Sequence, residues 1–315
     1  MSAYGPVPSR RLGRSIGINN IPAKTCTYSC VYCQLGRTNN LAAERREFYQ
    51  PKEIFAKVKK QVEISQSNQE TIDYLTFVPD GEATLESNLQ AEIDLVKQLN
   101  IPLAILTNSS LIEHENVRTA LCDLDVVSLK VDAVTERLWR RINRPHGSLG
   151  LDKILAGIAE FSNEYEGKII TETMLIDGID YSDELEKIGT FLADLNVSKA
   201  YIAIPTRPPA EEWVMPAPEE VLNEAFCIFS EKLGDERAEL LIGYEGNLFS
   251  STGDLENDLL GITAVHPMRE EAVKKLVAKT NSTWDAVEAM LVGNQLVRLE
   301  YEGEVYYIRR LPSRT

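Results

Sequence analysis

The sequence lacks the features that mark a secreted or membrane-spanning protein. Its 315 residues include only five cysteines and three histidines, and no run of about 18 apolar residues, the length a membrane span needs, occurs. The first 15 residues lack the apolar core of a signal peptide. Three of the five cysteines lie within eight positions, which is typical of metal binding rather than of a disulfide scaffold. We therefore expect a cytoplasmic protein without a membrane partner.

Positive charge is scarce overall but concentrated at the start of the chain. The formal net charge is −15, yet residues 1–60 carry +8 and residues 61–266 carry −24. The basic segment could meet an anionic substrate, or its side chains could pair with the acidic remainder. Because an acidic surface repels nucleic-acid phosphates, RNA is a disfavoured partner that stays open as an alternative.

Short β-rich segments alternate with amphipathic helical ones through most of the chain. This alternation is typical of βα units on a parallel sheet, and about six such units would curl into a partial (β/α)6 barrel of the α/β class. Ligands then bind at the carboxyl ends of the strands. Strands are expected at 15–19, 71–78, 102–106, 126–131, 168–176, 200–204 and 240–243, and helices at 51–64, 89–99 and 182–195.

The pattern changes near residue 248. Helices are expected at 254–261, 269–279 and 283–292, followed by strands at 295–301 and 304–310. Three helices and a β-ribbon predict a winged-helix domain over 249–315, after a barrel domain over 1–248. The third helix contains no Lys or Arg, so DNA is not an expected partner. The module could instead cover the barrel or recruit a peptide strand.

The strongest chemical signal is the spacing C-x3-C-x2-C formed by Cys26, Cys30 and Cys33. Soft thiolate ligands favour iron–sulfur clusters or zinc. A structural zinc site normally has four protein ligands, and every other Cys and His is distant in sequence. The pattern therefore favours a [4Fe-4S] cluster with one iron left open, although a remote fourth zinc ligand is not eliminated.

With Tyr32 before its last cysteine, the motif resembles the signature of the radical S-adenosylmethionine (SAM) superfamily, C-x3-C-x-aromatic-C. The resemblance implies that the open iron chelates SAM and that a reductant such as ferredoxin or flavodoxin supplies the electron. SAM is then cleaved to a 5′-deoxyadenosyl radical, which abstracts hydrogen from a substrate. In the family the aromatic residue lies beside the adenine, so Tyr32 is a candidate SAM contact.

A second motif follows the expected second strand. The segment Asp80-Gly81-Glu82 is similar to the Gly-Gly-Glu-Pro motif that grips the SAM amino group, with Asp80 in place of the first Gly and Ala83 in place of Pro. Gly81 permits a close approach of backbone, and Glu82 could accept a hydrogen bond from an ammonium group. A plain strand-to-helix turn is the alternative interpretation.

Polar residues also stand at the ends of the next strands. Asn108 follows the third strand and is a candidate for contact with the SAM ribose or carboxylate, or else a helix cap. Ser128, Lys130 and Asp132 alternate along the fourth strand and so share one face. We expect Ser128 and Lys130 to contact SAM. Because a buried lysine is costly unless paired, Lys130 should meet a carboxylate.

The loop after the sixth strand contains Arg207 and Glu211, which could form a substrate-facing pair or a surface ion pair. No residue can be assigned to catalysis from sequence alone. The candidates for contact with the reacting groups are Lys130, Asp132, Arg207 and Glu211.

The stretch 130–149 also resembles the wyosine-type tRNA synthases, and residues 10–245 resemble that branch of uncharacterised iron–sulfur oxidoreductases. Wyosine synthases have additional N-terminal cysteines, which this chain lacks. Three functions remain open. The first is a radical SAM enzyme acting on a small molecule, peptide or protein. The second is a tRNA-modifying enzyme, and the third is a non-catalytic, metal-binding winged-helix regulator.

Overall fold

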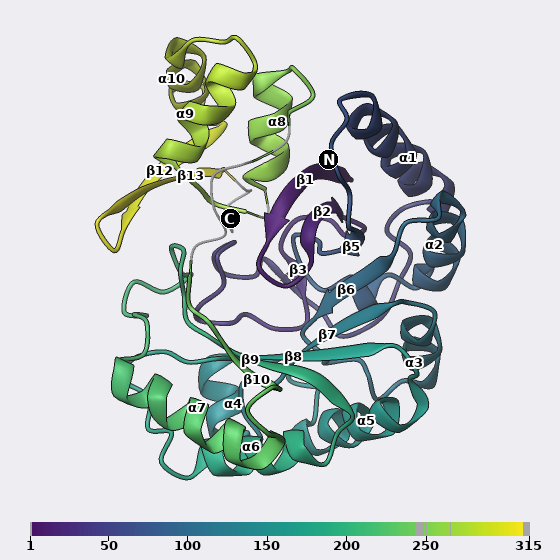
Figure 1. The fold of residues 1–315 in the computed structure, drawn as a ribbon, viewed down its shortest axis with the longest axis vertical. Coiled ribbons are helices and arrows are strands. Elements are labelled where there is room, and N and C mark those ends of the chain that lie inside the picture. The colour runs from purple at the N-terminus through teal and green to yellow at the C-terminus, as the bar shows by residue number, and fades with distance from the viewer. Residues whose placement is uncertain (1, 244–248, 250, 265, 311–315) are drawn as a thin grey trace. The chain divides into compact units, whose positions relative to one another are not determined.

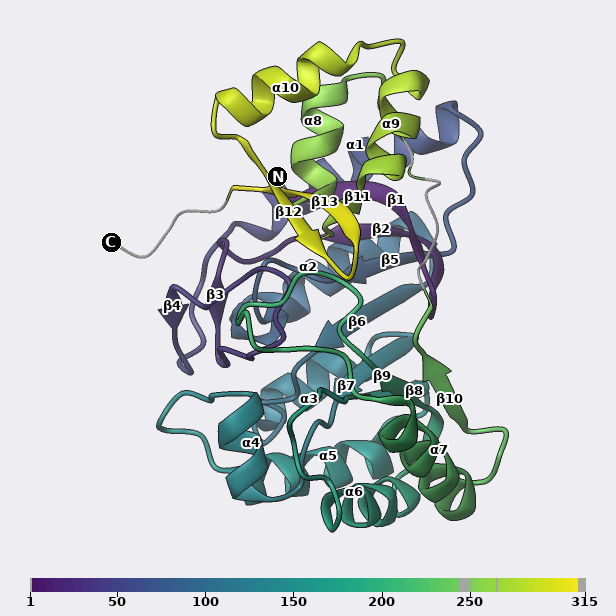
Figure 2. The ribbon, with the colours of Figure 1, turned by 90° about the vertical axis from the view of Figure 1, so that its left-hand side faces the viewer.

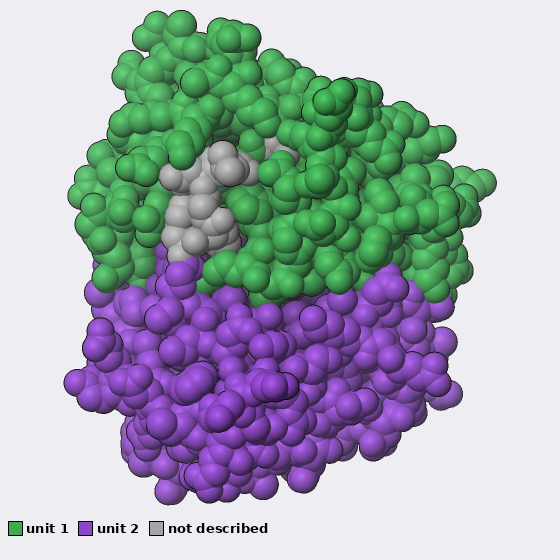
Figure 3. Space-filling model, in the orientation of Figure 1, with its two compact units in different colours: residues 1–25, 46–103, 244–315 green, residues 26–45, 104–243 purple. Residues whose placement is uncertain are grey.

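The computed structural model describes residues 2–243, 249, 251–264 and 266–310, which form alternating strands and helices (Figure 1). They fall into two compact units (Figure 3). The first unit comprises residues 1–25, 46–103 and 244–315, and the second comprises residues 26–45 and 104–243. No helix among the described residues is long and apolar enough to cross a membrane.

The strands of the first unit run in the order β1-β2-β5. Strand β1 (Ala3–Ser9) is antiparallel to β2 (Gly13–Ile18), which is parallel to β5 (Tyr74–Phe77). The expected strands at 15–19 and 71–78 are confirmed, but β1 was not predicted because it contains two prolines, Pro6 and Pro8. β1 lies at the sheet edge, where a missing N–H breaks no ladder.

Two amphipathic helices pack beside these strands. Helix α1 (Pro51–Ser67) begins with a proline, whose fixed φ suits the first helical position, and buries Ile54, Val58 and Val62, which are spaced four residues apart. Helix α2 (Leu89–Val96) continues into the short 3₁₀ helix η2 (Lys97–Leu99), so the expected helix at 89–99 is confirmed.

The second unit is built on the parallel strands β6 to β10 (Figure 2). Their order in the sheet is β6-β7-β8-β9-β10. Every one of them corresponds to an expected strand, with ends shifted by a few residues. Helices connect the strands because a parallel pair needs a long crossover. The strands are β6 (Leu103–Thr107), β7 (Val126–Lys130), β8 (Lys168–Met174), β9 (Val197–Ala203) and β10 (Ala238–Leu241). The helices are α3 (Glu115–Cys122), α4 (Glu136–Ile142), α5 (Leu151–Glu164), α6 (Glu184–Ala193) and α7 (Glu219–Leu233).

The C-terminal part of the first unit contains all five expected elements and the short strand β11 (Met268–Arg269), which was not predicted. The ribbon turns at Glu302 and Gly303, both with positive φ. The winged-helix assignment stays a prediction, and the proposed boundary at residue 248 lies outside the described residues. The elements are α8 (Leu255–Ile262), α9 (Glu270–Lys279), α10 (Trp284–Val292), β12 (Leu296–Tyr301) and β13 (Glu304–Arg309).

Gly81 marks a close crossing of two backbone segments within the first unit. The Lys24 amide donates to the Asp80 carbonyl at 2.7 Å, and the Glu82 amide donates to the Thr25 carbonyl at 3.2 Å. A Cβ atom on Gly81 would lie 1.8 Å from the Thr25 carbonyl oxygen. Only glycine therefore fits here, and the crossing fixes the chain just before Cys26.

We expect Gly81→Ala to lower the thermal unfolding temperature, because two backbone segments must move apart to admit the methyl group. The cost should be about 1–3 kcal/mol or more. Gly147→Ala is the control, since a Cβ there meets nothing within 4 Å. Differential scanning calorimetry of both variants measures the difference, and equal unfolding temperatures would contradict this interpretation.

A buried acid in the first unit should make stability depend on pH. Glu92 of α2 is fully buried, and its Oε2 accepts from Asn20 Nδ2 at 2.9 Å. Burial raises the pKa of Glu92 from 4.5 to about 8, so the folded state keeps a proton that the unfolded state releases. Stability from this group is therefore lost as the pH rises from 4.5 to about 8.

Glu92→Gln removes the ionisation and keeps an amide of similar shape. We expect the variant to gain up to about 5 kcal/mol of unfolding free energy over the wild type above pH 8, with no gain at pH 4. Denaturant unfolding at several pH values measures the gap, and Glu63→Gln on the exposed side of α1 is the control. Parallel pH curves for wild type and Glu92→Gln would disprove the assignment.

Candidate active site

The three predicted cysteines lie on one loop of the second unit. The loop leaves the short strand β3 (Thr25–Cys26) and returns at β4 (Asn40–Leu41), where the Ala42 amide donates to the Cys26 carbonyl at 3.0 Å. The Cys33 amide donates to the Cys30 carbonyl at 3.1 Å, which makes a tight turn between these two ligands. All three cysteines are reduced, half-buried thiols.

This donor set suits a cluster. Within the described part of the chain, no three His, Cys, Asp or Glu side chains are grouped around a position for a single metal ion. A cubane requires no such convergence, because each thiolate bonds to a different iron. Three soft donors on one loop therefore fit a [4Fe-4S] cluster, with Cys26, Cys30 and Cys33 as its ligands.

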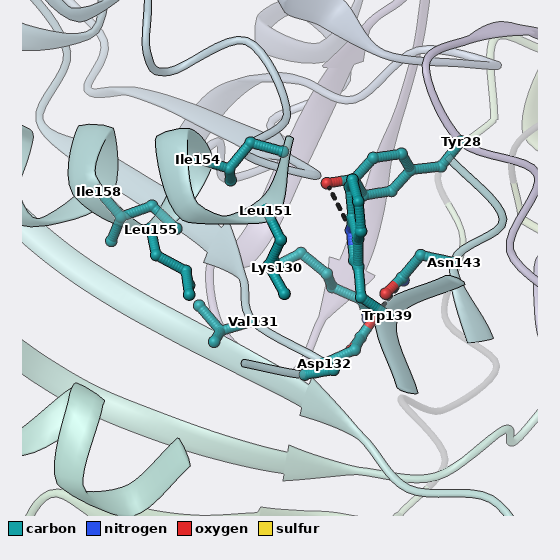
Figure 4. A pocket seen from close by; sticks show the side chains of 11 residues that line it. Tyr28, Lys130, Val131, Asp132, Trp139, Asn143, Leu151, Ile154, Leu155 and Ile158 are labelled. Atoms are coloured by element: carbon teal, nitrogen blue, oxygen red, sulfur yellow. Dashed lines mark hydrogen bonds between the residues drawn. The ribbon is translucent and has the colours of Figure 1, made fainter. Parts of the chain in front are cut away.

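Backbone hydrogen bonds join the cysteine loop to the end of α4 and the segment that follows it. The Ser29 amide donates to the Asn143 carbonyl at 3.0 Å, and the Val31 amide donates to the Ile142 carbonyl at 2.9 Å. Beside them, the Trp139 indole donates to the Tyr28 hydroxyl at 3.1 Å (Figure 4). Backbone bonds of this kind hold the cysteines in place independently of the side chains between them.

Two asparagine amides donate to cysteine sulfurs. Asn108 Nδ2 lies 3.5 Å from Cys26 Sγ and 2.7 Å from Thr27 Oγ1. Asn143 Nδ2 lies 3.5 Å from Cys30 Sγ. Asn108 was predicted as a SAM contact, which stays a prediction, whereas Asn143 was not singled out from sequence. Its contact with Cys30 is evident only from the structure, in which the segment after α4 faces the cysteine loop.

Asp132 is a buried carboxylate that joins several parts of the site. It accepts hydrogen bonds from the Tyr32 hydroxyl, from Asn143 Nδ2 at 2.7 Å and from the Met174 amide at 2.9 Å. Burial is the main cause that raises the pKa of the Tyr32 hydroxyl well above its usual range, and the charge of Asp132 is the second. Tyr32 is therefore a neutral hydrogen-bond donor. The same two causes raise the pKa of Cys30 to about 12, so a cluster's cationic iron is what would favour the thiolate.

Lys130 meets a carboxylate, as expected. Its ammonium forms an ion pair with Glu172 of β8 and lies 4.9 Å from the centroid of the Tyr32 ring. Ser128 is buried within β7. The SAM contacts expected for Tyr32, Ser128 and Lys130 stay predictions. Glu172 was missed as a partner because only the parallel register, which sets Lys130 beside it, brings the two together.

A small pocket opens behind these residues (Figure 4). Its polar side is formed by Lys130, Asp132 and Asn143, and its apolar side by residues of α5 such as Leu151 and Ile154. Two of the three polar residues predicted to share a face of this strand, Lys130 and Asp132, therefore line the pocket, and Ser128 is not part of its lining.

In the first unit, Asp80 and Glu82 are both buried. Glu82 Oε1 accepts from the Thr84 amide at 3.1 Å and from the Thr84 hydroxyl at 2.7 Å, so it caps the 3₁₀ helix η1 (Ala83–Leu85). Asp80 Oδ1 is buried without a hydrogen-bond partner among the described residues, and burial raises the pKa of Asp80 to about 6. The glycine's close approach is present as predicted. The contact of this motif with SAM stays a prediction.

The loop after β9 lies against the cysteine loop. The Glu211 amide donates to the Val31 carbonyl at 3.1 Å, and the Glu211 carboxylate pairs with Arg37 at 2.9 Å and with Arg144. Arg207 donates to Gln34 at 2.6 Å. The hydrogen bond from Arg37 is the main cause that holds the pKa of Glu211 below its usual range. Sequence reasoning did not single out Arg37 or Arg144.

Comparison with known proteins agrees with this arrangement. A family model for the radical SAM superfamily matches residues 20–191. The UPF0026 protein of Methanocaldococcus jannaschii is 49% identical over 313 residues, which cover 99% of this chain and 97% of that protein.

Solved structures show the same fold. A radical SAM methyltransferase from Sphaerobacter thermophilus has 15% identity and a TM-score of 0.55, with 72% of this chain and 66% of that one covered. SuiB of Streptococcus suis, bound to SAM, has 14% identity and a TM-score of 0.52, with 71% of this chain covered. The chain spans about half the length of SuiB, 49%.

The expected α/β fold with a parallel sheet is thereby confirmed. The protein is an enzyme, and the cofactors of its superfamily are SAM and a [4Fe-4S] cluster. By its cysteine loop, its sheet and its relatives, the chain belongs to the radical SAM superfamily and, within it, to the UPF0026 proteins.

Proposed function

We propose that Cys26, Cys30 and Cys33 hold a [4Fe-4S] cluster in this enzyme. We further propose that the enzyme uses SAM, either as a co-substrate or as a regenerated cofactor, to abstract hydrogen from a substrate. The substrate class is a small molecule, a peptide or a protein. The observation that carries the proposal is one loop bearing three reduced thiols, two of which receive amide hydrogen bonds.

When bound, the cluster and SAM supply reductive cleavage of the sulfonium to a 5′-deoxyadenosyl radical, with a ferredoxin or flavodoxin as the electron donor. The protein's own residues bind and orient. The thiolates of the loop anchor the irons, and the backbone bonds to residues 142 and 143 keep the loop in place. Asp132 fixes the Tyr32 hydroxyl, and so the orientation of the ring proposed to face adenine.

The substrate would be met by charged groups near the cysteine loop. The ion pair of Lys130 and Glu172 is nearly buried, with side-chain exposures of 17% and 11%, so each charge is stabilised by the other. Either could exchange its partner for a group of SAM or of the substrate. Arg207 and Glu211 stand on the loop that contacts the cysteine segment and are proposed as substrate-facing residues.

We expect Cys30→Ala to abolish SAM cleavage by the anaerobically reconstituted, dithionite-reduced enzyme while leaving its helical content nearly unchanged. The loop is held by backbone hydrogen bonds, so loss of one thiol should remove a cluster ligand rather than the fold. Chromatography measures SAM cleavage as the amount of 5′-deoxyadenosine formed, and far-ultraviolet circular dichroism measures helical content.

Cys227→Ala is the matched control, because Cys227 is an exposed thiol on α7. It should keep full cleavage. If the wild type binds zinc and shows neither iron–sulfur absorbance nor SAM cleavage, the enzyme interpretation fails and the metal-binding regulator becomes the better one. Unfolding of Cys30→Ala would show that the cysteines are structural.

A further inference from the structure

We propose that Asn143 and Asn108 raise the reduction potential of the cluster by donating amide hydrogen bonds to the thiolates of Cys30 and Cys26. The inference rests on the proposed function, since it concerns the same cluster. It assigns these two asparagines as positioning residues that act through the cluster ligands.

Asn143 is buried, and both its backbone and its side chain form hydrogen bonds. It is 2% exposed, its amide N–H donates to the Trp139 carbonyl at 2.8 Å, and its carbonyl accepts from Ser29 at 3.0 Å. Its Nδ2 lies 2.7 Å from Asp132 Oδ2 and 3.5 Å from Cys30 Sγ. An ionised carboxylate only accepts hydrogen bonds, so the NH2 end of the side chain, and not its oxygen, must face Asp132 and the sulfur.

Asn108 is oriented by a different neighbour. Its Oδ1 accepts from the Ser110 amide at 3.0 Å, and a backbone N–H can only donate. The NH2 end is therefore turned to Thr27 Oγ1 at 2.7 Å and Cys26 Sγ at 3.5 Å. Two of the three predicted cysteine ligands thus accept a hydrogen bond from an asparagine N–H group whose orientation is fixed by an independent contact.

Such donors favour reduction. The electron adds negative charge that spreads onto the sulfur atoms, so an N–H group stabilises the reduced cluster more than the oxidised one, and hydrogen bonds to the sulfurs raise the potential. Asp132 alone would oppose this, since its charge lies close to Cys30. Its hydrogen bonds from Tyr32, Asn143 and Met174 reduce that opposition.

The test compares Asn143→Leu and Asn108→Leu with the wild type, since leucine has a similar volume but no donor. Ser110→Ala is the control. Ser110 is fully buried, and its hydroxyl is bonded to Thr27 Oγ1 at 2.7 Å rather than to a cysteine sulfur. The cluster's midpoint potential is measured on each reconstituted protein by anaerobic redox titration monitored by electron paramagnetic resonance, without SAM.

We expect each Leu variant to be about tenfold harder to reduce, which is a midpoint potential about 59 mV more negative for a one-electron couple, and Ser110→Ala to match the wild type. The two Leu variants test the point separately, so failure of one to fold leaves the other.

The inference would be overturned if both Leu variants had the wild-type midpoint potential, or one shifted no more than in Ser110→Ala. In that case, SAM cleavage by the wild type would still uphold the proposed function. Loss of the cluster from both Leu variants with native circular dichroism would also overturn it, because the asparagines would then build the site rather than tune it. Absence of a reducible cluster in the wild type would overturn both proposals.

Discussion

The hydrogen bonds of the buried Asp132 carboxylate are the interaction on which the described site depends. They join the end of β7 to the end of β8 through the Met174 amide, and to the cysteine loop through Tyr32 and Asn143. A buried carboxylate is costly unless it is satisfied, so each of these donors lowers the cost of burying Asp132. The same network that relieves this cost therefore sets the orientation of the aromatic residue in the cysteine motif.

The sequence could predict what is local and periodic. The strands of the parallel sheet and the amphipathic helices follow from hydrophobic spacing, and the cysteine motif follows from three donors placed within eight positions. β1 was missed because Pro6 and Pro8 argue against a strand, and only its edge position makes them tolerable. Asn143, Glu172 and Arg37 were missed for another reason. Their partners are remote in sequence, and no local pattern shows which side chains they meet.

The segment from Asp80 to Glu82 shows that a motif can have a structural and a functional interpretation at once. Gly81 is required by the crossing of Thr25, whether or not a ligand approaches. Glu82 already caps η1, so a SAM amino group would have to share its carboxylate with Thr84. Asp80, in contrast, has one buried carboxylate oxygen without a hydrogen-bond partner among the described residues, and burial raises its pKa to about 6. Of the three, Asp80 is therefore the residue whose environment is least explained by the fold alone.

Net charge is a poor guide to the field at this site. Residues 61–266 carry −24, yet the cysteine loop is bordered by Arg37 and Arg144, which share the single carboxylate of Glu211. Exposed charges are screened beyond about 8–10 Å in physiological salt, so these neighbours matter more there than the acidic surface elsewhere. Arg37 and Arg144 are 65% and 41% exposed, which leaves both available to solvent-borne anions as well as to Glu211. The acidic composition that argues against RNA therefore applies to the protein as a whole and only weakly to this loop.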